Sequence, residues 1–278
     1  MVPNKKQTIR FVIANLETDM DLGIAGRTAL ICGASKGLGR ACAEALAAEG
    51  VHLVITGRNA EALEQTAAAL RAKFSVRVTA AAGDITTDAG RTAALAACPE
   101  PDILINNAGG PPVGDWRSFT REQWLAAVDG NMVTAIMVTR QVIDGMAQRG
   151  FGRVVNITSA MVKAPNPALS LSVAARLGLT GFAKAIAPAY VKSNVTINNL
   201  LPEQFETDRL RSNLAKLAAG SGRSLEEESA AQIASSPAGR FGRVEEFGAV
   251  CAFYCSAHAG FLTAQNVLLD GGRYPAVF

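Results

Sequence analysis

The feature that most constrains the fold is a glycine-rich segment between an apolar run and an alanine-rich stretch. Residues 28–32 are typical of a short buried strand, and residues 40–50 have the apolar spacing and the closing glycine of a helix. Glycines at such a junction allow a tight turn and leave no Cβ between a ligand and the helix N-terminus, whose free amides suit a phosphate. The segment therefore predicts a dinucleotide-binding βαβ unit. Its expected cofactor contacts are Gly33, Ser35, Lys36, Gly37, Leu38 and Gly39.

The same alternation continues along the chain. Further apolar runs predict strands at 51–56, 76–80, 102–105, 153–157, 195–201 and 266–270. Helical patterns occupy 60–73, 121–149, 172–184 and 244–256, and the polar, weakly helical segment 208–237 is typical of a substrate lid. We predict an α/β class protein, a single-domain doubly wound Rossmann fold, with a central parallel sheet of about seven strands and helices on both faces. The domain is expected to span 20–278, preceded by an N-terminal extension, 1–19, that is either disordered or packed on a neighbouring subunit through the strand-like run 9–13.

Composition narrows the functional classes. With 278 residues, 49% hydrophobic and 18% charged, the chain can bury a sizeable core, as expected of a cytoplasmic enzyme. The net charge of +3 is small and dispersed, which argues against a nucleic acid or an anionic membrane as partner. Five cysteines without a CxxC motif predict buried free thiols in a reducing compartment, and the two histidines are too isolated to predict a metal site. We find no run long enough to span a bilayer and no recognisable signal peptide.

The end of the second predicted strand indicates which nicotinamide cofactor binds. NAD-binding proteins commonly place a carboxylate there, to hold the ribose 2′-hydroxyl. Here Gly57 and Arg58 occupy this place, and Lys36 lies inside the glycine loop. Two cations beside the ribose would stabilise a 2′-phosphate, so we predict NADP(H); the alternative is that both are solvated surface cations.

Taken together, the segments resemble the short-chain dehydrogenase/reductase family from roughly Leu22 to Gly272, and within it the 3-oxoacyl-acyl-carrier-protein-reductase-like branch. The resemblance is carried by the glycine loop, Asp84-Ile85, Asn106-Asn107-Ala108-Gly109, Asn131, Ser159, Pro202 with Thr207, and Asp270-Gly271-Gly272. It implies that Asp84 and Ile85 flank the adenine. By the same resemblance, Asn107, Ala108 and Gly109 line the cofactor, and Pro202 and Thr207 lie at its carboxamide end. Cys32 and Glu203 depart from the family pattern, which has threonine and glycine there.

A larger departure lies at the catalytic pair. The resemblance implies Tyr-x-x-x-Lys, with the tyrosine thirteen residues after the catalytic serine, but counting from Ser159 reaches Ser172 and Arg176. A tyrosine beside a lysine can protonate a developing alkoxide, whereas a serine is a far weaker acid. A guanidinium stays protonated, although it could still hold the nicotinamide ribose. The candidate catalytic residues are Asn131, Ser159, Ser172, Arg176 and Lys163.

Lys163, four residues after Ser159, is one candidate for the missing acid. Desolvated in this loop it could donate a proton, or it could bind an acidic substrate; a solvated loop lysine is the alternative. Water ordered by Ser159 and Ser172 is another possible source of the proton.

Three functions are compatible with these residues. The first is an NADP(H)-dependent oxidoreductase acting on a small carbonyl or alcohol, and the second is a non-catalytic NADP(H)-binding protein. A redox-neutral lyase or dehalogenase is disfavoured, because such members of the family lose the glycine loop and keep the tyrosine. We also expect a homo-oligomer, a tetramer or dimer, because the helices near 121–149 and 170–190 are apolar on more than one face and pair between subunits in this family.

Overall fold

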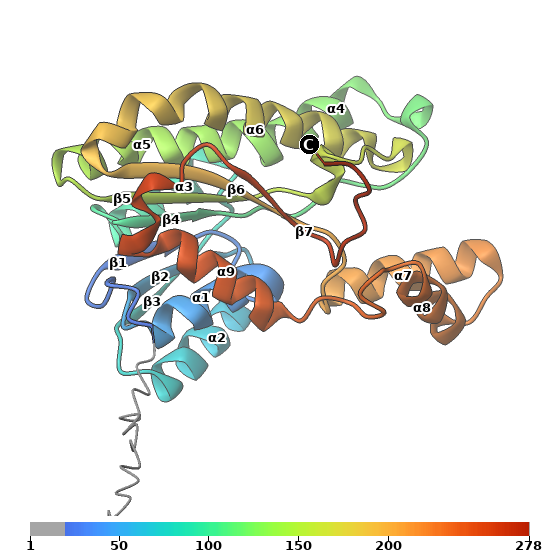
Figure 1. Cartoon of the computed structure of the whole chain (residues 1–278), viewed down its shortest axis with the longest axis horizontal. Helices are drawn as coiled ribbons and strands as arrows, with labels where there is room; N and C mark the ends of the chain where they lie inside the picture. Colours follow the sequence, from blue (N-terminus) through green and yellow to red (C-terminus); the bar gives the residue numbers. More distant parts are fainter. Residues whose placement is uncertain (1–19, 278) are drawn as a thin grey trace, which may run out of the picture.

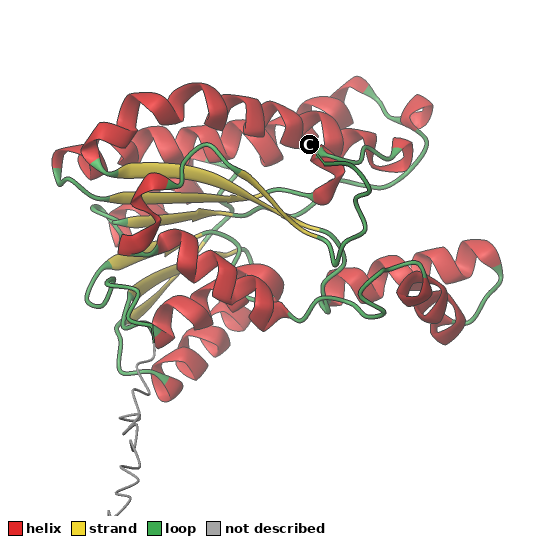
Figure 2. Cartoon of the chain, in the orientation of Figure 1, coloured by secondary structure: helices red, strands yellow, loops and turns green. Residues whose placement is uncertain are grey.

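The structure, a computed structural model, describes residues 20–277, so the extension 1–19 with its strand-like run lies outside the described residues. Seven strands form one sheet in the order β3-β2-β1-β4-β5-β6-β7, and all neighbouring pairs are parallel. The strands are β1 (Thr28–Ile31), β2 (His52–Gly57), β3 (Val78–Ala82), β4 (Ile103–Asn106), β5 (Gly152–Ile157), β6 (Val195–Pro202) and β7 (Asn266–Leu269). The predicted doubly wound parallel sheet is confirmed (Figure 2).

Helices cover both faces of the sheet (Figure 1). One face packs against α1 (Gly37–Ala48), α2 (Ala60–Lys73) and α9 (Val244–Cys255). The other packs against α3 (Asp88–Ala97), α5 (Thr134–Gln148) and α6 (Ser170–Tyr190). Successive residues of one strand enter opposite cores: Ala29 and Ile31 join the first, and Leu30 the second. Burial on both faces explains why the strands are uninterrupted apolar runs.

Three segments differ from the predicted pattern. Strand β3 begins two residues later than expected, and α3, which was not predicted, begins after Thr87, whose hydroxyl accepts the Gly90 N–H at 3.1 Å. The segment predicted to be weakly helical forms two regular helices, α7 (Asp208–Ser221) and α8 (Leu225–Ala234). Thr207 and Ser224 cap them, and capping offsets the weak apolar periodicity. In Figure 1 these helices project from the body as an arm.

The long helix predicted over 121–149 is interrupted. It consists of α4 (Arg121–Val128), a π-helical turn (Asp129–Val133) and α5. The extra residue of a π-turn changes which side chains face the sheet, and such turns often occur at functional sites. Asn131 lies in this turn and is only 8% exposed.

The longest helix, α6, is strongly apolar. The stretch Pro167–Ser193 is long and apolar enough to cross a membrane by length and composition alone, so the expectation that no run is long enough is wrong. Core helices of soluble proteins pass the same test, and α6 packs against β6 and the π-helical turn. Only 28% of its most apolar window is buried within the single chain. Several apolar side chains of α6 are therefore not covered within the single chain, and Leu177, for example, is 42% exposed.

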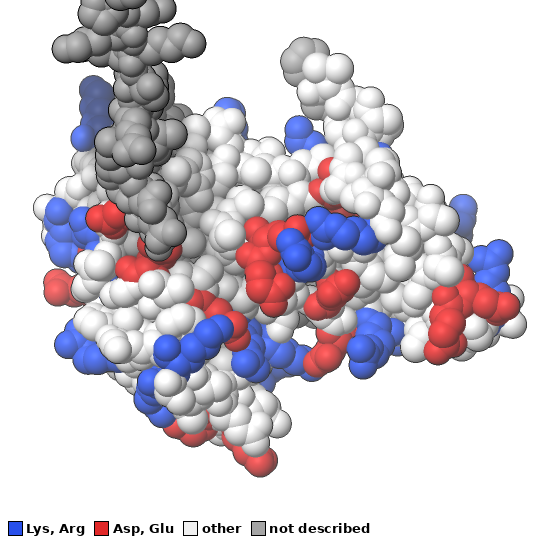
Figure 3. All heavy atoms as spheres, turned by 60° about the horizontal axis from the view of Figure 1, so that its bottom comes forward, with Lys and Arg blue, Asp and Glu red and all other residues white. Residues whose placement is uncertain are grey.

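The distribution of charged side chains and the burial of the cysteines agree with what the composition predicts. Acidic and basic side chains are interspersed on the face drawn in Figure 3. All five cysteines are buried and unpaired, as predicted for free thiols.

Candidate active site

The site lies where the direction of winding reverses. Strands β1 and β4 are neighbours, but the chain proceeds from β1 toward β3 on one side and from β4 toward β7 on the other. Loops leaving the two strands therefore diverge and open a crevice at the carboxyl edge of the sheet. The glycine loop follows β1 and the segment Asn107–Gly109 follows β4, and the Cys32 N–H joins them by donating to the Ile105 carbonyl at 2.9 Å.

Glycine is required at two kinds of position in this loop. Gly33 and Gly37 have φ of +61°, which L side chains rarely adopt. Gly39 lies so close to the loop that a Cβ there would be 2.4 Å from the Gly33 carbonyl oxygen. The Asn107 side-chain amide donates to that same oxygen at 3.1 Å. The glycine loop therefore lies in close contact with the first turn of α1. Asn107, which follows the neighbouring strand β4, holds it there by this hydrogen bond.

The N-terminus of α1 has free donors. Its N-cap residue, Lys36, makes no capping hydrogen bond from its side chain to any described residue. Five other helices are capped by side chains, namely α2 by Asn59, α3 by Thr87, α4 by Thr120, α7 by Thr207 and α8 by Ser224, whereas α5 and α6 continue from preceding helical turns and have no side-chain cap. Uncapped amides and the positive end of the helix dipole suit a pyrophosphate, so the residues present fit a dinucleotide.

The predicted ribose-phosphate residues lie near the end of β2. Gly57 is close to the glycine loop, because a Cβ on it would be 3.4 Å from the Ser35 hydroxyl. Arg58 follows it and is exposed, while the Lys36 ammonium forms a 3.4 Å ion pair with Asp208. Exposed pairs of this kind contribute little stability, so an anionic ligand can compete for Lys36.

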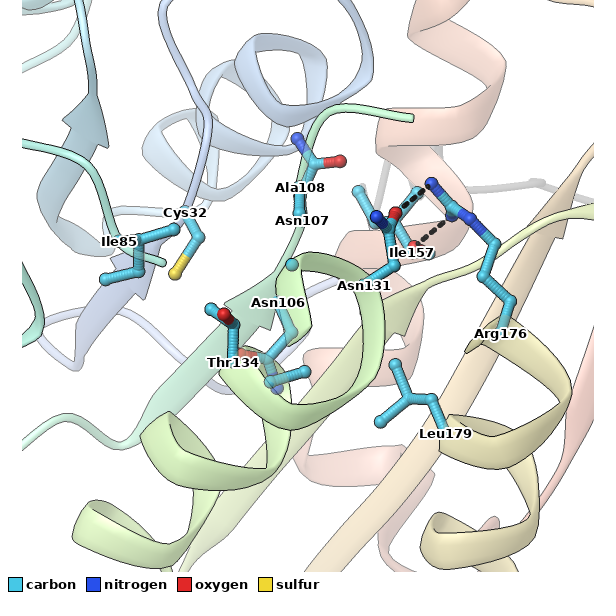
Figure 4. A pocket seen from close by; sticks show the side chains of 12 residues that line it. Cys32, Ile85, Asn106, Asn107, Ala108, Asn131, Thr134, Ile157, Arg176 and Leu179 are labelled. Atoms are coloured by element: carbon cyan, nitrogen blue, oxygen red, sulfur yellow. Dashed lines mark hydrogen bonds between the residues drawn. The ribbon is translucent and has the colours of Figure 1, made fainter. Parts of the chain in front are cut away.

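The residues predicted to flank the adenine follow the end of β3. The Thr86 backbone N–H and hydroxyl donate to Asp84 at 3.0 and 2.8 Å. The backbone hydrogen bond holds the pKa of Asp84 below its usual value, and the nearby charge of Arg58 acts in the same direction. Ile85 is buried and faces the crevice (Figure 4). Arg58, Asp84 and Ile85 are thus brought to one side of the crevice.

A cavity of about 20 Å³ lies deeper in the crevice, with room for about one water molecule. Five predicted site residues line it: Ile85, Asn107, Ala108, Asn131 and Arg176. Sequence reasoning missed the other lining residues, which are Cys32, Asn106, Gly130, Thr134, Ala135, Ile157 and Leu179. Burial raises the pKa of Cys32 to about 12, so its thiol is neutral and acts as an apolar wall.

Arg176 is the most constrained side chain of the site. Its guanidinium donates to the Ile157 carbonyl at 3.0 Å, to the Thr158 carbonyl, and to the Asn131 side-chain oxygen at 3.1 Å (Figure 4). Burial lowers the pKa of Arg176 to about 10, and the charge of Arg209 acts in the same direction. The group still carries its positive charge at neutral pH. Its Nε is buried and finds no acceptor within residues 20–277, which leaves one donor for a ligand.

The two candidate hydroxyls lie on different elements. Ser159 begins the short helical turn Ala160–Val162, and its hydroxyl accepts the Met161 N–H at 3.2 Å. Ser172 is half-buried in the first turn of α6, one turn before Arg176. Lys163 ends the turn that Ser159 begins, and its ammonium lies 5.8 Å from the centre of the Tyr274 ring. Ser159, Ser172 and Lys163 do not line the small cavity.

Thr207, which is predicted to lie at the carboxamide end of the cofactor, stands at the start of the arm. Thr207 caps α7, and its methyl group is 3.6 Å from the place of a Cβ on Gly37. Arg209 donates to the Gly110 and Pro111 carbonyls at 3.4 and 3.3 Å, so α7 touches the loop after β4. Beyond this contact the arm borders a groove of about 1420 Å³ beside α1.

A row of asparagines was not predicted. Asn106, Asn156, Asn199 and Asn266 occupy paired positions on β4, β5, β6 and β7. The side-chain amides all donate in one direction along the row, each to the neighbouring asparagine. Asn106 donates to Asn156 and Asn156 to Asn199 at 2.9 Å, and Asn199 donates to Asn266 at 2.8 Å. The signal in the sequence was an asparagine in each of these four strands. The row pairs the buried amides of Asn106, Asn156 and Asn199 and ends at the exposed Asn266.

Comparison with known proteins identifies the family. The profile of the family described as short chain dehydrogenase matches residues 27–218. The gluconate 5-dehydrogenase of Gluconobacter oxydans (strain 621H) is 30% identical over 253 residues, with 90% of this chain and 95% of that protein covered. The acetoacetyl-CoA reductase of Cupriavidus necator is 32% identical over 254 residues, with 89% and 98% covered.

Solved structures agree with this assignment. The L-sorbose reductase from Gluconobacter frateurii, solved with NADPH and L-sorbose, superposes with a TM-score of 0.88 at 28% identity, covering 93% of this chain and 100% of that one. This relative was solved with NADPH bound, which confirms the prediction of NADP(H) as cofactor. With the matched profile, the relatives over nearly their full length and the shared fold, the chain belongs to the short-chain dehydrogenase family.

Proposed function

We propose that this protein is an NADP(H)-dependent oxidoreductase that acts on a small carbonyl or alcohol with an atypical acid/base set. The observation that carries the proposal is the uncapped N-terminus of α1 beneath the glycine loop, with Lys36 and Arg58 at the ribose end. Oxidoreductases among its relatives support the reaction class. Because the two apolar cores share a single sheet, we also propose one domain over 20–278. The buried free cysteines support a cytoplasmic location.

We assign each part of the bound cofactor to particular residues of the site. The α1 amides and Ser35 would hold the pyrophosphate, Lys36 and Arg58 the 2′-phosphate, and Asp84 and Ile85 the adenine. Asn107, Ala108, Gly109, Pro202 and Thr207 would border the nicotinamide half. The unpaired Nε of Arg176 would donate to a ribose hydroxyl. When bound, the nicotinamide supplies or accepts the hydride of the reaction.

The chain itself must orient the carbonyl and move the proton. Ser159 lies at the end of β5, where its hydroxyl can donate to a carbonyl oxygen. Asn131 is committed to Arg176 and to the Ala127 carbonyl, so it positions the guanidinium. Arg176 cannot relay a proton, because it stays charged, and the Ser172 hydroxyl is a weak acid. The proton of this reaction therefore comes from another group, for which Lys163 is the nearest cationic candidate.

The second candidate function is a non-catalytic NADP(H)-binding protein. Ser172 and Arg176 favour this function, because a site with these two residues could bind the cofactor without moving a proton. Ser159, which closely follows β5, argues for turnover, because cofactor binding alone gives no need for its hydroxyl.

The first prediction concerns cofactor preference. We expect NADPH to bind more tightly than NADH, because Arg58 and Lys36 can form charge-assisted hydrogen bonds with the 2′-phosphate. Arg58→Ala should weaken NADPH binding about 10- to 100-fold, as for the loss of one hydrogen bond to a charged group, and leave NADH binding unchanged. Calorimetric titration measures both, with the exposed Arg140→Ala on α5 as the matched control. Equal affinities of the wild type for the two cofactors would contradict the prediction.

The second prediction separates the two candidate functions. If the wild type has its own acid, the double variant Ser172→Tyr, Arg176→Lys should raise its carbonyl reductase rate little. NADPH absorbance at saturating cofactor, over a panel of ketones and aldehydes, measures the rate. The non-catalytic function predicts a different result: an inert wild type that binds NADPH, and a double variant that alone gains about 10²- to 10⁴-fold from a positioned acid.

The third prediction is a homo-oligomer, a dimer or tetramer. Leu125 on α4 and Leu177 on α6 are 51% and 42% exposed in the single chain, and α6 as a whole is apolar and incompletely covered. Sedimentation equilibrium at micromolar concentration should show the assembly, and Leu177→Glu should dissociate it. A wild type that sediments only as a monomer is the contrary result.

A further inference from the structure

The C-terminal segment brings a tyrosine to the carboxyl edge of the sheet. Tyr274 is half-buried, and the Lys163 ammonium lies 5.8 Å from the centre of its ring, within the range of a cation–π contact. The two residues are far apart in the sequence, but Lys163 follows β5 and Tyr274 follows β7. In Figure 1 the red end of the chain runs from β7 toward the start of α6. A phenol and an ammonium therefore meet at the mouth of the crevice.

The backbone of Tyr274 is held by a tight turn. Asp270 accepts the Gly272 N–H with one carboxylate oxygen at 2.9 Å and the Tyr274 N–H with the other at 2.7 Å. Gly271 and Gly272 have φ of +65° and +85°, which the turn needs and which other residues would resist. The turn fixes the direction in which the chain leaves β7.

A buried ion pair anchors the same segment to the neighbouring strand. Arg273 donates to the Glu203 carboxylate at 2.9 Å, and it also donates to the Ser235 hydroxyl at the end of α8. The Glu203 side chain is only 13% exposed and directly follows β6. Glu203 is also the residue that departs from the family pattern after Pro202. Its carboxylate thus has a partner that belongs to the C-terminal segment.

Lys163 also belongs to the short helical turn that begins at Ser159. The turn that begins at Ser159 is closed by two backbone bonds, from the Val162 N–H to the Ser159 carbonyl at 3.1 Å and from the Lys163 N–H to the Ala160 carbonyl at 2.9 Å. Lys163 therefore lies one short turn from the serine expected to orient the carbonyl. The contact with Tyr274 extends this group of residues outward from Ser159.

The other two tyrosines of the chain are elsewhere. Tyr190 ends α6 at its far end, where its hydroxyl donates to Asp144 at 3.1 Å. Tyr254 lies on α9, which covers the opposite face of the sheet. Tyr274 alone of the three has a neighbouring ammonium at the carboxyl edge among the described contacts.

We propose that Tyr274 is the proton donor of the reaction and that Lys163 is its cationic partner. The inference rests on the proposed function and names the acid that Ser172 and Arg176 cannot supply. As the carbonyl carbon gains the hydride that the reduced nicotinamide supplies, the C=O π bond breaks and the oxygen takes the proton of the Tyr274 hydroxyl. The Lys163 ammonium stabilises the phenolate that remains, and a proton taken up from the solvent then restores the phenol. The products are an alcohol, NADP⁺ and the restored phenol.

The kinetic test uses Tyr274→Phe, which keeps the ring and its packing but removes the hydroxyl. We expect kcat for NADPH-dependent carbonyl reduction to fall about 10²- to 10⁴-fold, with KM for the carbonyl and Kd for NADPH unchanged. Lys163→Met should lower kcat in the same direction, and Ser172→Tyr added to Tyr274→Phe should restore part of the rate. Tyr190→Phe is the matched control and should retain the wild-type rate.

A second measurement does not depend on turnover. Nitration by tetranitromethane, followed by peptide mass spectrometry, reports the access of reagent to each tyrosine. Saturating NADP⁺ should slow nitration of Tyr274 and leave that of Tyr190 unchanged, because only the former borders the site.

The outcomes distinguish the inference from the proposed function. An active wild type whose Tyr274→Phe variant keeps its rate overturns the role of Tyr274 and leaves the proposed function standing. Equal nitration of Tyr274 with and without NADP⁺ also overturns it. A wild type that binds NADPH and reduces no carbonyl of the panel overturns the proposed function itself.

Discussion

The site depends on a guanidinium that is locked in place. Arg176 gives three of its donors to the Ile157 and Thr158 carbonyls and to Asn131, so it joins the end of β5, the π-helical turn and α6. A guanidinium bound in this way supplies a fixed positive charge and links three elements of the site. Its pKa, although lowered by burial to about 10, leaves it charged at neutral pH, so it can neither donate nor accept a proton in a catalytic cycle.

This constraint separates two tasks. Cofactor binding needs the close approach of Gly39 to Gly33, the free amides of α1 and the open Nε of Arg176, all of which are in place. Proton transfer needs a titratable hydroxyl near a cation, which Ser172 and Arg176 do not provide. In the proposed account the C-terminal segment supplies it, held by Asp270 and by the pair of Arg273 with Glu203. The unusual residue after β6 and the unusual residues on α6 then belong to one rearrangement of the site.

Much of the fold could be predicted because parallel strands buried on both faces are continuous apolar runs, as at 28–32 and 153–157. Helix α3 escaped prediction because its boundary depends on the Thr87 cap, and the break at 129–133 because a π-turn leaves no mark in apolar spacing. The glycine loop could be located from local order alone, and Arg176 by counting from Ser159 on the pattern of the resembled family. The asparagine row and the contact of Lys163 with Tyr274 could not, because each depends on strand order and register.

The central claim is that the chain turns over its cofactor despite the residues at 172 and 176. Single-turnover reaction with NADPH deuterated at the transferred C4 position, analysed by mass spectrometry of the carbonyl panel, tests it most directly. The account predicts that the wild type forms a product alcohol carrying the deuterium in proportion to the NADP⁺ produced. Bound NADPH that stays reduced, with no labelled alcohol from any carbonyl, would contradict it.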